Sequence, residues 1–267
     1  MTGTIGVELG DGVATVTISH AVRFNAMSRV MWRELRAVFE ELQISTEVRC
    51  VVVRGEGGHF CAGGDISEYA SFRFEEATLR DFHENDVWGA LAAMLACDVP
   101  MVAHIEGNCM GAGVEIASCC DIRLASTEAR FGAPIAKLGF PMAPREAALV
   151  AREVGLMTAR QMLLEAAIFS APEMQARGFI SRLLAPAVLG DEVRATAQRI
   201  ASLAPQAARA NKQVIRALSN PLAEAGDPQT PCMLALNPLN SPYAYASSYE
   251  HREGIEAFIS KRTPRFF

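Results

Sequence analysis

Two glycine-rich turns constrain the fold of this chain more than any other feature. The first, His59–Ile66, follows the apolar run Cys50–Val53, and the second, Asn108–Glu115, follows the apolar run Met101–Ala103. Glycine lets the backbone turn sharply and come close to a ligand. A helix that begins directly after such a turn points its free N–H groups outward. Two such groups that converge on one point would form an oxyanion hole, which indicates an enzyme acting on a carbonyl group.

Strand-like and helix-like segments alternate along most of the chain. This alternation predicts an α/β fold in which parallel strands are joined by crossover connections. The expected strands are 5–9 and 13–18 (a hairpin around Gly10-Asp-Gly12), 49–54, 101–105, 121–125 and 180–184. The expected helices are 29–43 (capped by Ser28), most of 71–95, 112–119, 145–153, 158–165, 172–177, 189–203, 205–217 and 243–260. We therefore expect a core over 1–188 and a helical C-terminal region over 189–267 that packs on the core or on another subunit.

The composition is that of a protein with a large buried core. Of the 267 residues, 50% are hydrophobic, and the net charge of −5 gives no reason to expect nucleic acid or an anionic membrane as partner. The seven cysteines are an odd number in apolar surroundings, which favours buried free thiols over disulfides. Their spacing does not predict a metal site. Without a secretory signal or a long apolar run, we expect a cytoplasmic protein.

Several motifs occur in a characteristic order along nearly the whole chain. They are Asn25-Ala-Met27, Phe60-Cys-Ala-Gly-Gly-Asp-Ile66, Gly107-Asn-Cys-Met-Gly-Ala-Gly-Val-Glu115, Cys120-Asp-Ile122, Phe131-Gly132 and Glu253-Gly-Ile-Glu-Ala-Phe-Ile-Ser-Lys261. In this order the chain resembles the enoyl-CoA hydratase/isomerase (crotonase) family. The resemblance implies a repeated ββα spiral with a C-terminal helical region used in trimerisation, and hence a homotrimer or a dimer of trimers. It also implies an acyl-CoA thioester as substrate, with coenzyme A as part of that substrate and no permanently bound cofactor.

The resemblance assigns catalytic roles to three residues. The two amides of the oxyanion hole match Gly64 and Ala112, and one of the family's two catalytic glutamates matches Glu115. Because Ala112 opens a helix, the helix dipole should add to the effect of its N–H. Glu115 lies among apolar residues, so burial should raise its pKa and suit it to acid–base work. The alternatives are that the turns serve only helix–strand packing and that Glu115 only stabilises its helix N-terminus.

The second catalytic glutamate of the family is replaced in this chain. Where the family has Phe-Gly-x-Pro-Glu, the sequence reads Phe131-Gly-Ala-Pro-Ile135, and an isoleucine cannot transfer a proton. Ile135 can only contribute to the wall of the substrate pocket. This change argues against efficient hydration of a carbon–carbon double bond. Isomerisation and decarboxylation stay open as alternative reactions. The change also leaves open a CoA-ester-binding protein with little or no hydratase activity.

Other charged residues near these motifs are weaker candidates. Glu146 and Arg145 could reach the site from the altered loop 135–145, but charges that open a helix usually lie on the surface. His59 and His104 flank the two turns and are more often structural. We expect the pocket walls to come from 67–86 and from 135–145.

Contacts with coenzyme A follow from the resemblance alone. The positions that match CoA-binding residues of the family are Arg23, Ala62, Asp65, Ile66 and Lys261. For Arg23 and Lys261, a solvated surface charge is the alternative.

A serine or cysteine hydrolase is a third hypothesis. The chain lacks a Gly-x-Ser-x-Gly elbow and a convincing nucleophile–base pair. Covalent labelling of Cys61 or Cys109 during turnover would be needed to revive this hypothesis.

Overall fold

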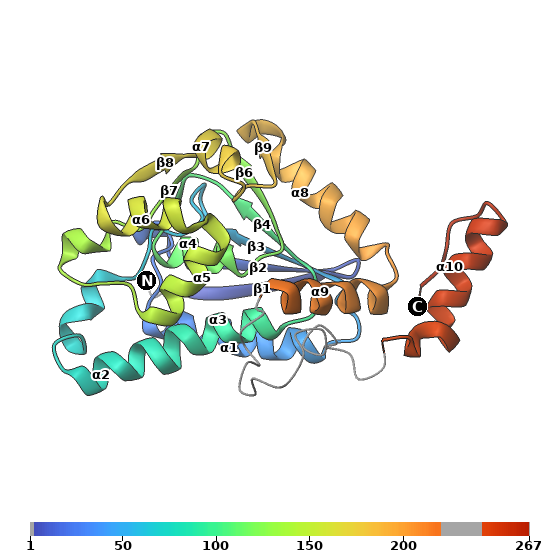
Figure 1. Ribbon diagram of the computed structural model, residues 1–267, viewed down its shortest axis with the longest axis horizontal. Helices are drawn as coiled ribbons and strands as arrows, with labels where there is room; N and C mark the ends of the chain where they lie inside the picture. Colours follow the sequence, from blue (N-terminus) through green and yellow to red (C-terminus); the bar gives the residue numbers. More distant parts are fainter. Residues whose placement is uncertain (1–2, 220–241, 267) are drawn as a thin grey trace, which may run out of the picture.

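Two β-sheets of unequal size organise the computed structural model, which describes residues 3–219 and 242–266 (Figure 1). The strands are β1 (Thr4–Gly10), β2 (Val13–Ser19), β3 (Cys50–Gly55), β4 (Met101–Ile105), β5 (Asn108–Met110), β6 (Ile122–Ser126), β7 (Arg130–Gly132), β8 (Ile168–Ser170) and β9 (Arg182–Leu184). The α-helices are α1 (Arg29–Ile44), α2 (Glu76–Asp81), α3 (Trp88–Ala96), α4 (Ala112–Ser118), α5 (Pro144–Val154), α6 (Leu156–Leu164), α7 (Ala171–Ala176), α8 (Pro186–Ala201), α9 (Pro205–Ser219) and α10 (Tyr249–Ile259). Short 3-10 helices are η1 (Ala21–Arg23), η2 (Ile66–Ser71), η4 (Ile135–Leu138) and η5 (Ala244–Ser247), and η3 (Phe82–Val87) is a π-helical turn.

The larger sheet has the strand order β1-β2-β3-β4-β6-β9. β1 pairs antiparallel with β2 around Asp11 and Gly12, both at positive φ, as the sequence predicted for a hairpin with this turn. From β2 onward the neighbouring strands are parallel. The predicted α/β fold with parallel pairing is therefore confirmed.

The smaller sheet, β5-β7-β8, was not predicted. Each of its strands has three residues, too few to show an alternating pattern in the sequence. β5 runs parallel to β7, and β7 runs antiparallel to β8. β5 directly precedes α4, and Cys109 of β5 forms a parallel bridge with Cys61, so the start of α4 lies close to the first glycine turn.

The helix α1 has the predicted cap and the predicted buried face. The Ser28 hydroxyl accepts a hydrogen bond from the Met31 N–H, which satisfies one of the free donors at the helix start. Met31, Leu35 and Phe39 are fully buried in the main core. In Figure 1, α1 and α3 lie side by side against one face of the larger sheet.

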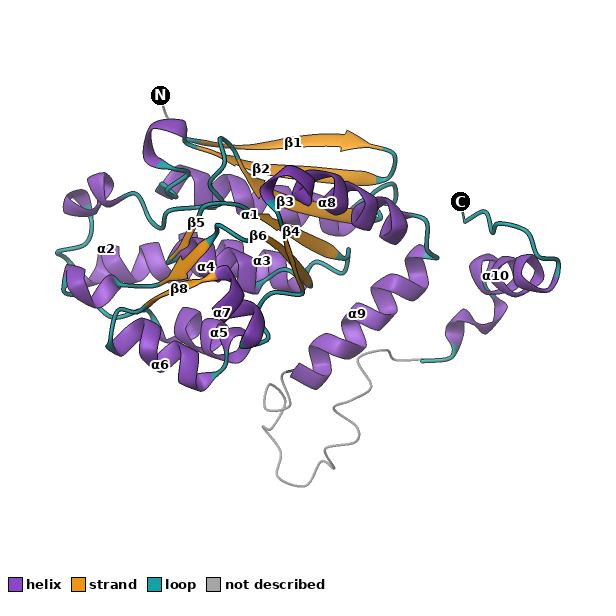
Figure 2. Cartoon of the chain, turned by 90° about the horizontal axis from the view of Figure 1, so that it is seen from above, coloured by secondary structure: helices purple, strands orange, loops and turns teal. Residues whose placement is uncertain are grey.

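The helix α8 covers the opposite face of that sheet (Figure 2). It begins at Pro186, so the expected boundary between 188 and 189 falls inside this helix. Leu189, Val193 and Ala197 form a second apolar cluster with Val102 of β4 and other strand residues. The division of the chain into a core and a C-terminal region stays a prediction.

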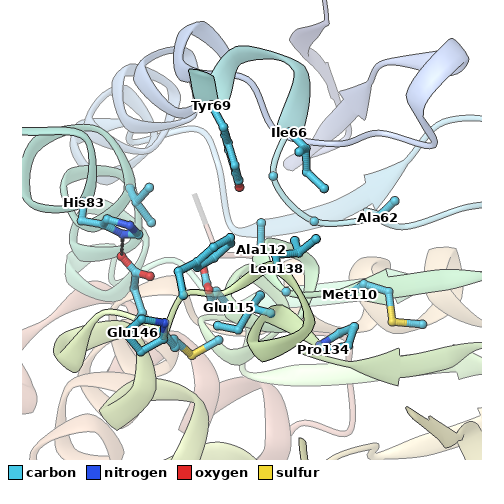
Figure 3. A pocket seen from close by; sticks show the side chains of 18 of the residues that line it. Ala62, Ile66, Tyr69, His83, Met110, Ala112, Glu115, Pro134, Leu138 and Glu146 are labelled. Atoms are coloured by element: carbon cyan, nitrogen blue, oxygen red, sulfur yellow. Dashed lines mark hydrogen bonds and ion pairs between the residues drawn. The ribbon is translucent and has the colours of Figure 1, made fainter. Parts of the chain in front are cut away.

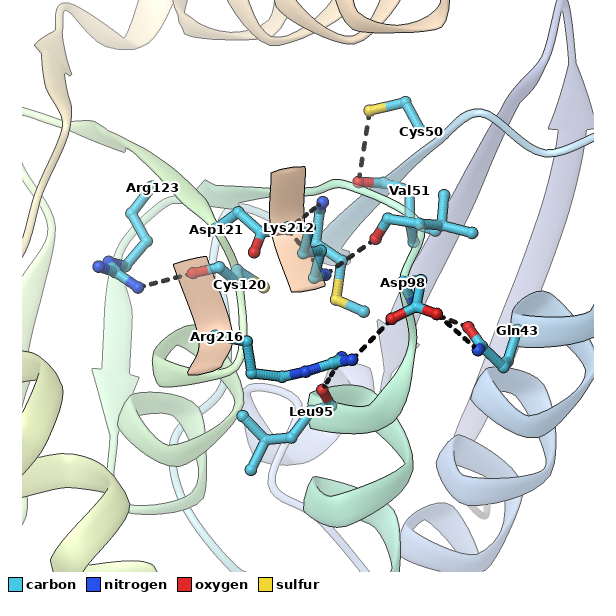
Figure 4. Close-up of polar contacts among 12 residues, drawn as sticks. Gln43, Cys50, Val51, Leu95, Asp98, Cys120, Asp121, Arg123, Lys212 and Arg216 are labelled. Carbon is cyan, nitrogen blue, oxygen red and sulfur yellow. Dashed lines mark hydrogen bonds and ion pairs between the residues drawn. The ribbon is translucent and has the colours of Figure 1, made fainter. Parts of the chain in front are cut away.

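The helix α9 is held to the core by charged side chains (Figure 4). Lys212 donates to the Val99 carbonyl at 2.9 Å and pairs with Asp121 at 2.8 Å. Arg216 pairs with Asp98 at 2.7 Å and also donates to a carbonyl of α3. These contacts anchor the C-terminal region to the loops around β4.

The helix α10 lies away from the rest of the chain at one end of the molecule (Figures 1 and 2). Glu250 accepts a hydrogen bond from the Gln206 N–H at 3.0 Å, and Arg49 donates to the Phe266 carbonyl at 2.7 Å.

In the part of the chain that the structure describes, no helix is both long and apolar enough to span a membrane.

The Asn25 side chain links the segment before α1 to the first glycine turn. It accepts a hydrogen bond from the His20 N–H at 2.9 Å and donates to the carbonyls of Glu56 at 2.8 Å and His59 at 2.7 Å. Asn25 is fully buried and has a φ of 63°, a conformation that asparagine tolerates better than most residues.

We expect Asn25→Ala to lower the free energy of unfolding by at least about 2 kcal/mol, because it leaves buried polar groups without partners and places alanine at positive φ. Urea unfolding of the wild type and the variant measures this difference. Glu40→Gln, which breaks only the exposed ion pair with Arg36, is the control and should change the free energy by less than about 0.5 kcal/mol. Equal effects of the two substitutions would contradict the role of Asn25.

Candidate active site

The two glycine turns are joined directly by backbone hydrogen bonds. A parallel bridge pairs Cys61 with Cys109, in which the Cys61 N–H donates to the Asn108 carbonyl at 2.9 Å and the Met110 N–H donates to the Cys61 carbonyl at 2.8 Å. A Cβ atom at Gly113 would lie 2.6 Å from the Cys61 carbonyl oxygen. Glycine at this position therefore permits the close approach of α4 to the first turn.

The amides of Gly64 and Ala112 lie at the junction of these turns. Both residues line one cavity, and neither N–H donates a hydrogen bond to another residue within 3–219 or 242–266. Gly63 and Gly111 precede them at φ values of 113° and 46°, conformations that favour glycine. The arrangement agrees with the predicted oxyanion hole, whose role in catalysis stays a prediction.

The cavity beside these amides has a volume of about 420 Å³ (Figure 3). Its walls include Ile66, Tyr69 and Phe82, together with Ile135 and Met142. The predicted walls, 67–86 and 135–145, thus contribute to the cavity. Most of its lining is apolar, as is typical of a ligand pocket with a few polar groups.

Glu115 projects from α4 into this cavity. It is 6% exposed, and its carboxyl group makes no hydrogen bond or ion pair with another described residue. Burial, followed by the negative charge of Glu146, raises the pKa of Glu115 well above its usual value. The predicted direction of the shift is confirmed.

Glu146 is the second carboxyl group of the cavity, and the expectation that it is a surface charge is wrong. It is 3% exposed and lines the cavity together with Glu115 (Figure 3). Pro144 occupies the start of α5, which places Glu146 on the same helix face as the buried Leu149 and Val150. The spacing i, i+3, i+4 is the sequence signal that identifies this inward face.

Arg145, in contrast, is a surface charge as expected. It forms an ion pair with Glu84 at 2.9 Å, in which both side chains are largely exposed.

His83 contacts Glu146 at the cavity wall, and the sequence did not identify it as a candidate site residue. Its Nδ1 lies 2.8 Å from a carboxylate oxygen of Glu146. With Glu146 ionised, the carboxylate can only accept, so Nδ1 carries the proton. His83 belongs to the π-helical turn η3, where the buried Asp86 accepts hydrogen bonds from Arg29 at 2.6 Å and Arg33 at 2.7 Å. These contacts hold the turn against α1 and leave His83 at the cavity wall.

Comparison with known proteins assigns the family. The family model described as enoyl-CoA hydratase/isomerase matches residues 8–267. The chain belongs to the enoyl-CoA hydratase/isomerase family. It is 33% identical over 204 residues to a short-chain-enoyl-CoA hydratase of Clostridium acetobutylicum, covering 76% of this chain and 77% of the relative. It is 29% identical to the 2,3-dehydroadipyl-CoA hydratase of Escherichia coli, and this match covers 95% of this chain and 94% of the relative.

Solved structures of the family share the fold. The crystal structure of an enoyl-CoA hydratase/carnithine racemase from Magnetospirillum magneticum superposes with a TM-score of 0.89 at 34% identity. This match covers 100% of the present chain and 96% of that chain. The crotonase-like ββα spiral predicted from the motifs is therefore confirmed.

Tyr69 is a further polar group of the enoyl-CoA hydratase/isomerase site that the sequence did not reveal. A side chain at Gly64 would overlap the Tyr69 hydroxyl, so this hydroxyl lies directly beside the candidate oxyanion hole. Burial raises the pKa of Tyr69 to about 12, which keeps the hydroxyl neutral and able to donate.

The residues that the family resemblance assigned to CoA binding divide into two groups. Ala62 and Ile66 line the cavity. Arg23 and Asp65 do not line it and form an ion pair at 3.2 Å, and Asp65 also caps η2. Lys261 follows α10 and does not line the cavity. The proposed CoA contacts of all five residues stay predictions.

The two histidines that flank the turns lie outside the cavity lining. The His59 Nδ1 accepts a hydrogen bond from the Asn108 N–H at 3.1 Å, which fixes the turn. His104 lies in β4 with its Nε2 3.5 Å from Glu106, a distance too long for a strong hydrogen bond. Their positions agree with structural roles.

The cysteines give no support to the hydrolase hypothesis. Cys50, Cys61, Cys97, Cys109, Cys119 and Cys120 are buried free thiols, as predicted, and Cys232 lies outside the described residues. Burial raises the pKa of Cys61 to about 12 and that of Cys109 well above its usual value. Such thiols are poor nucleophiles because the thiolate is the reactive form.

The raised pKa of Glu115 predicts a pH dependence of stability. The folded protein binds this proton more tightly than the unfolded chain, so the free energy of unfolding should fall as pH rises from the ordinary glutamate range through the raised pKa. Glu115→Gln cannot ionise and should lose this fall, becoming more stable than the wild type at high pH. Urea unfolding between about pH 4 and pH 9 measures both curves. Parallel curves would show that Glu115 ionises as freely in the folded protein as in the unfolded chain.

Proposed function

We propose that this protein is a hydratase of 2-enoyl-CoA thioesters that uses Glu115 and Glu146 as its proton-transfer pair. The observation that carries the proposal is the position of Glu146, whose carboxyl group lines the same cavity as Glu115. Hydration needs two groups that handle protons, one for the water and one for the α-carbon. The loss of a carboxylate at Ile135 is thus offset by one from α5. The names of the hydratases among the relatives support the same reaction.

The thioester oxygen would accept hydrogen bonds from the Gly64 and Ala112 amides. Both N–H groups are free for this role within the described part of the chain, and they belong to turns fixed by the Cys61–Cys109 bridge. Donors placed in this way stabilise the negative charge that develops on the oxygen, and removal of one such donor typically costs about 10²–10³ in rate. Ala62 and Ile66 would contact the CoA moiety at this end of the cavity.

The proton transfers follow from the different environments of the two carboxyl groups. Glu146, which accepts a hydrogen bond from His83, would take a proton from water as the water oxygen bonds to the β-carbon. The electrons of the carbon–carbon double bond move toward the thioester oxygen, giving an enolate. Glu115, whose raised pKa favours the protonated form, would then donate a proton to the α-carbon. A proton returned from Glu146 to Glu115 restores the starting state.

Two alternatives to hydration follow from the missing second glutamate of the family. One is a protein that binds CoA esters without turnover, and the other is a decarboxylase. The buried Glu146 weakens the reason for both, because a pure binding site has no need of two closely placed carboxyl groups, which repel each other when ionised. Decarboxylation likewise needs no acid–base pair.

We expect Glu115→Gln and Glu146→Gln each to lower kcat for hydration of a short 2-enoyl-CoA by about 10²–10⁴, because each removes one proton-transfer group. Loss of the enoyl-thioester absorbance measures the rate. Glu84→Gln is the matched control, since Glu84 is exposed and pairs only with Arg145 at the surface. Full activity of Glu146→Gln would refute the proposed pair, while activity lost only in Glu115→Gln would point to chemistry with a single carboxyl group.

We further propose that the enzyme assembles as a homotrimer or a dimer of trimers through its C-terminal region. Support comes from α10, where Phe258 is 85% exposed and Ile259 is 74% exposed in the single chain. Light scattering during size exclusion should give three or six protomers, and Phe258→Asp should shift the population toward smaller species. A monomeric wild-type protein would contradict the assembly.

A further inference from the structure

Arg73 is a positively charged side chain of the cavity for which hydration has no evident use. It follows η2 and lines the same cavity as Glu115 and Glu146. Its guanidinium lies over the ring of Phe140, 3.9 Å from the centroid, and over the ring of Tyr69, 4.4 Å from the centroid. Rings on two segments, η2 and the loop before α5, thus define the position of this charge.

The Arg73 guanidinium has no anionic partner in the part of the chain that the structure describes. Neither an ion pair nor a side-chain hydrogen bond joins it to a described residue. Burial lowers its pKa, and Tyr69 and Glu146 act in the other direction. Cation–π contacts stabilise the charge but provide no oxygen acceptor. The five N–H donors of the side chain therefore remain available to a ligand.

The surroundings of Arg73 favour a small anion over a large, hydrated one. The Arg73 guanidinium also lies 6.0 Å from the centroid of the Phe82 ring. The Tyr69 and Phe140 rings contact each other edge to face, so the rings around the guanidinium form one aromatic cluster. A carboxylate matches the planar fork of an arginine and can bind it in a bidentate manner. Arg73 lines the same cavity as Glu115 and Glu146, which is where the acyl group lies in the proposed function.

We propose that Arg73 binds a carboxylate at the far end of the acyl chain, so that the preferred substrates are CoA monothioesters of unsaturated dicarboxylic acids. This inference rests on the proposed function for the placement of the acyl group. The aromatic cluster holds the guanidinium before the substrate arrives, which reduces the ordering needed on binding. The carboxylate supplies the acceptor that the described residues do not. Without it, an acyl chain with a terminal methyl group would leave a half-buried guanidinium facing an apolar surface.

The test compares matched pairs of 2-enoyl-CoA thioesters of four to six acyl carbons that end in either a methyl group or a carboxylate. The wild type should have the higher kcat/KM for the carboxylate member at the best-fitting length. Arg73→Met should lower kcat/KM for that member by about tenfold to a hundredfold, the usual effect of losing a hydrogen bond to a charged group, and should change the methyl member by less than about threefold. Arg73→Lys keeps the charge and should retain part of the preference.

Arg80→Met is the matched control, because Arg80 is exposed and pairs with Glu76 outside the cavity. It should leave the rates for both thioesters unchanged. Equal losses for the two thioesters in Arg73→Met and Arg73→Lys, or a wild type that favours the methyl member at every length, would overturn the proposal.

Calorimetric binding of the saturated thioesters separates this proposal from the proposed function. The wild type should bind the saturated carboxylate thioester more tightly than its methyl counterpart, and Arg73→Met should remove that difference. If this result is obtained but no enoyl-CoA is hydrated, the role of Arg73 stands and the hydratase proposal fails. Equal binding of the two saturated thioesters by the wild type would refute the role of Arg73.

Discussion

The site depends on the close contact of two backbone turns. The parallel bridge between Cys61 and Cys109 ties the turn after β3 to the segment before α4, and Gly113 leaves room for the Cys61 carbonyl. Because the contact is made by backbone groups, it fixes the Gly64 and Ala112 amides relative to each other with little dependence on side-chain rotamers. Donors that are already in place need no reorganisation when charge develops on a bound carbonyl. The positions of Glu115 and of the cavity walls follow from this contact.

The contact between the two turns also determines the electrostatic surroundings of Glu115. A short, fully buried helix carries Glu115 to a cavity whose lining is mostly apolar, and α5 brings Glu146 to the same space. Burial, followed by the negative charge of Glu146, raises the pKa of Glu115. His83 breaks the symmetry, since its Nδ1 contacts only Glu146. The two carboxyl groups therefore differ in their surroundings, since that of Glu115 makes no hydrogen bond with another described residue and that of Glu146 contacts His83.

The sequence predicted the features that rest on local patterns. The hairpin turn, the Ser28 cap, the buried face of α1 and the glycine turns all depend on neighbouring residues, and each is present. Residues that act through contacts distant in the chain were harder to predict. His83 faces the cavity only because a π-helical turn rotates it there, and the sequence of 71–95 gives no sign of that turn. Glu146 was assigned to the surface because charges that open a helix are usually exposed, although the apolar Leu149 and Val150 follow it at i+3 and i+4 on the same helix face.

The replacement of a glutamate by Ile135 also has a structural meaning. Ile135 opens the short 3-10 helix η4, whereas Glu146 belongs to α5, a helix of eleven residues with Leu149 and Val150 buried beside it. A carboxyl group on a longer, packed helix is held more firmly than one on a single 3-10 turn, because the surrounding buried side chains fix the helix. The change also leaves an apolar side chain at η4 in the cavity wall. Phe140, which contacts Arg73, lies in the loop before α5, and Glu146 lies in the first turn of that helix. One segment of the chain therefore supplies both an aromatic and a carboxyl group to the cavity.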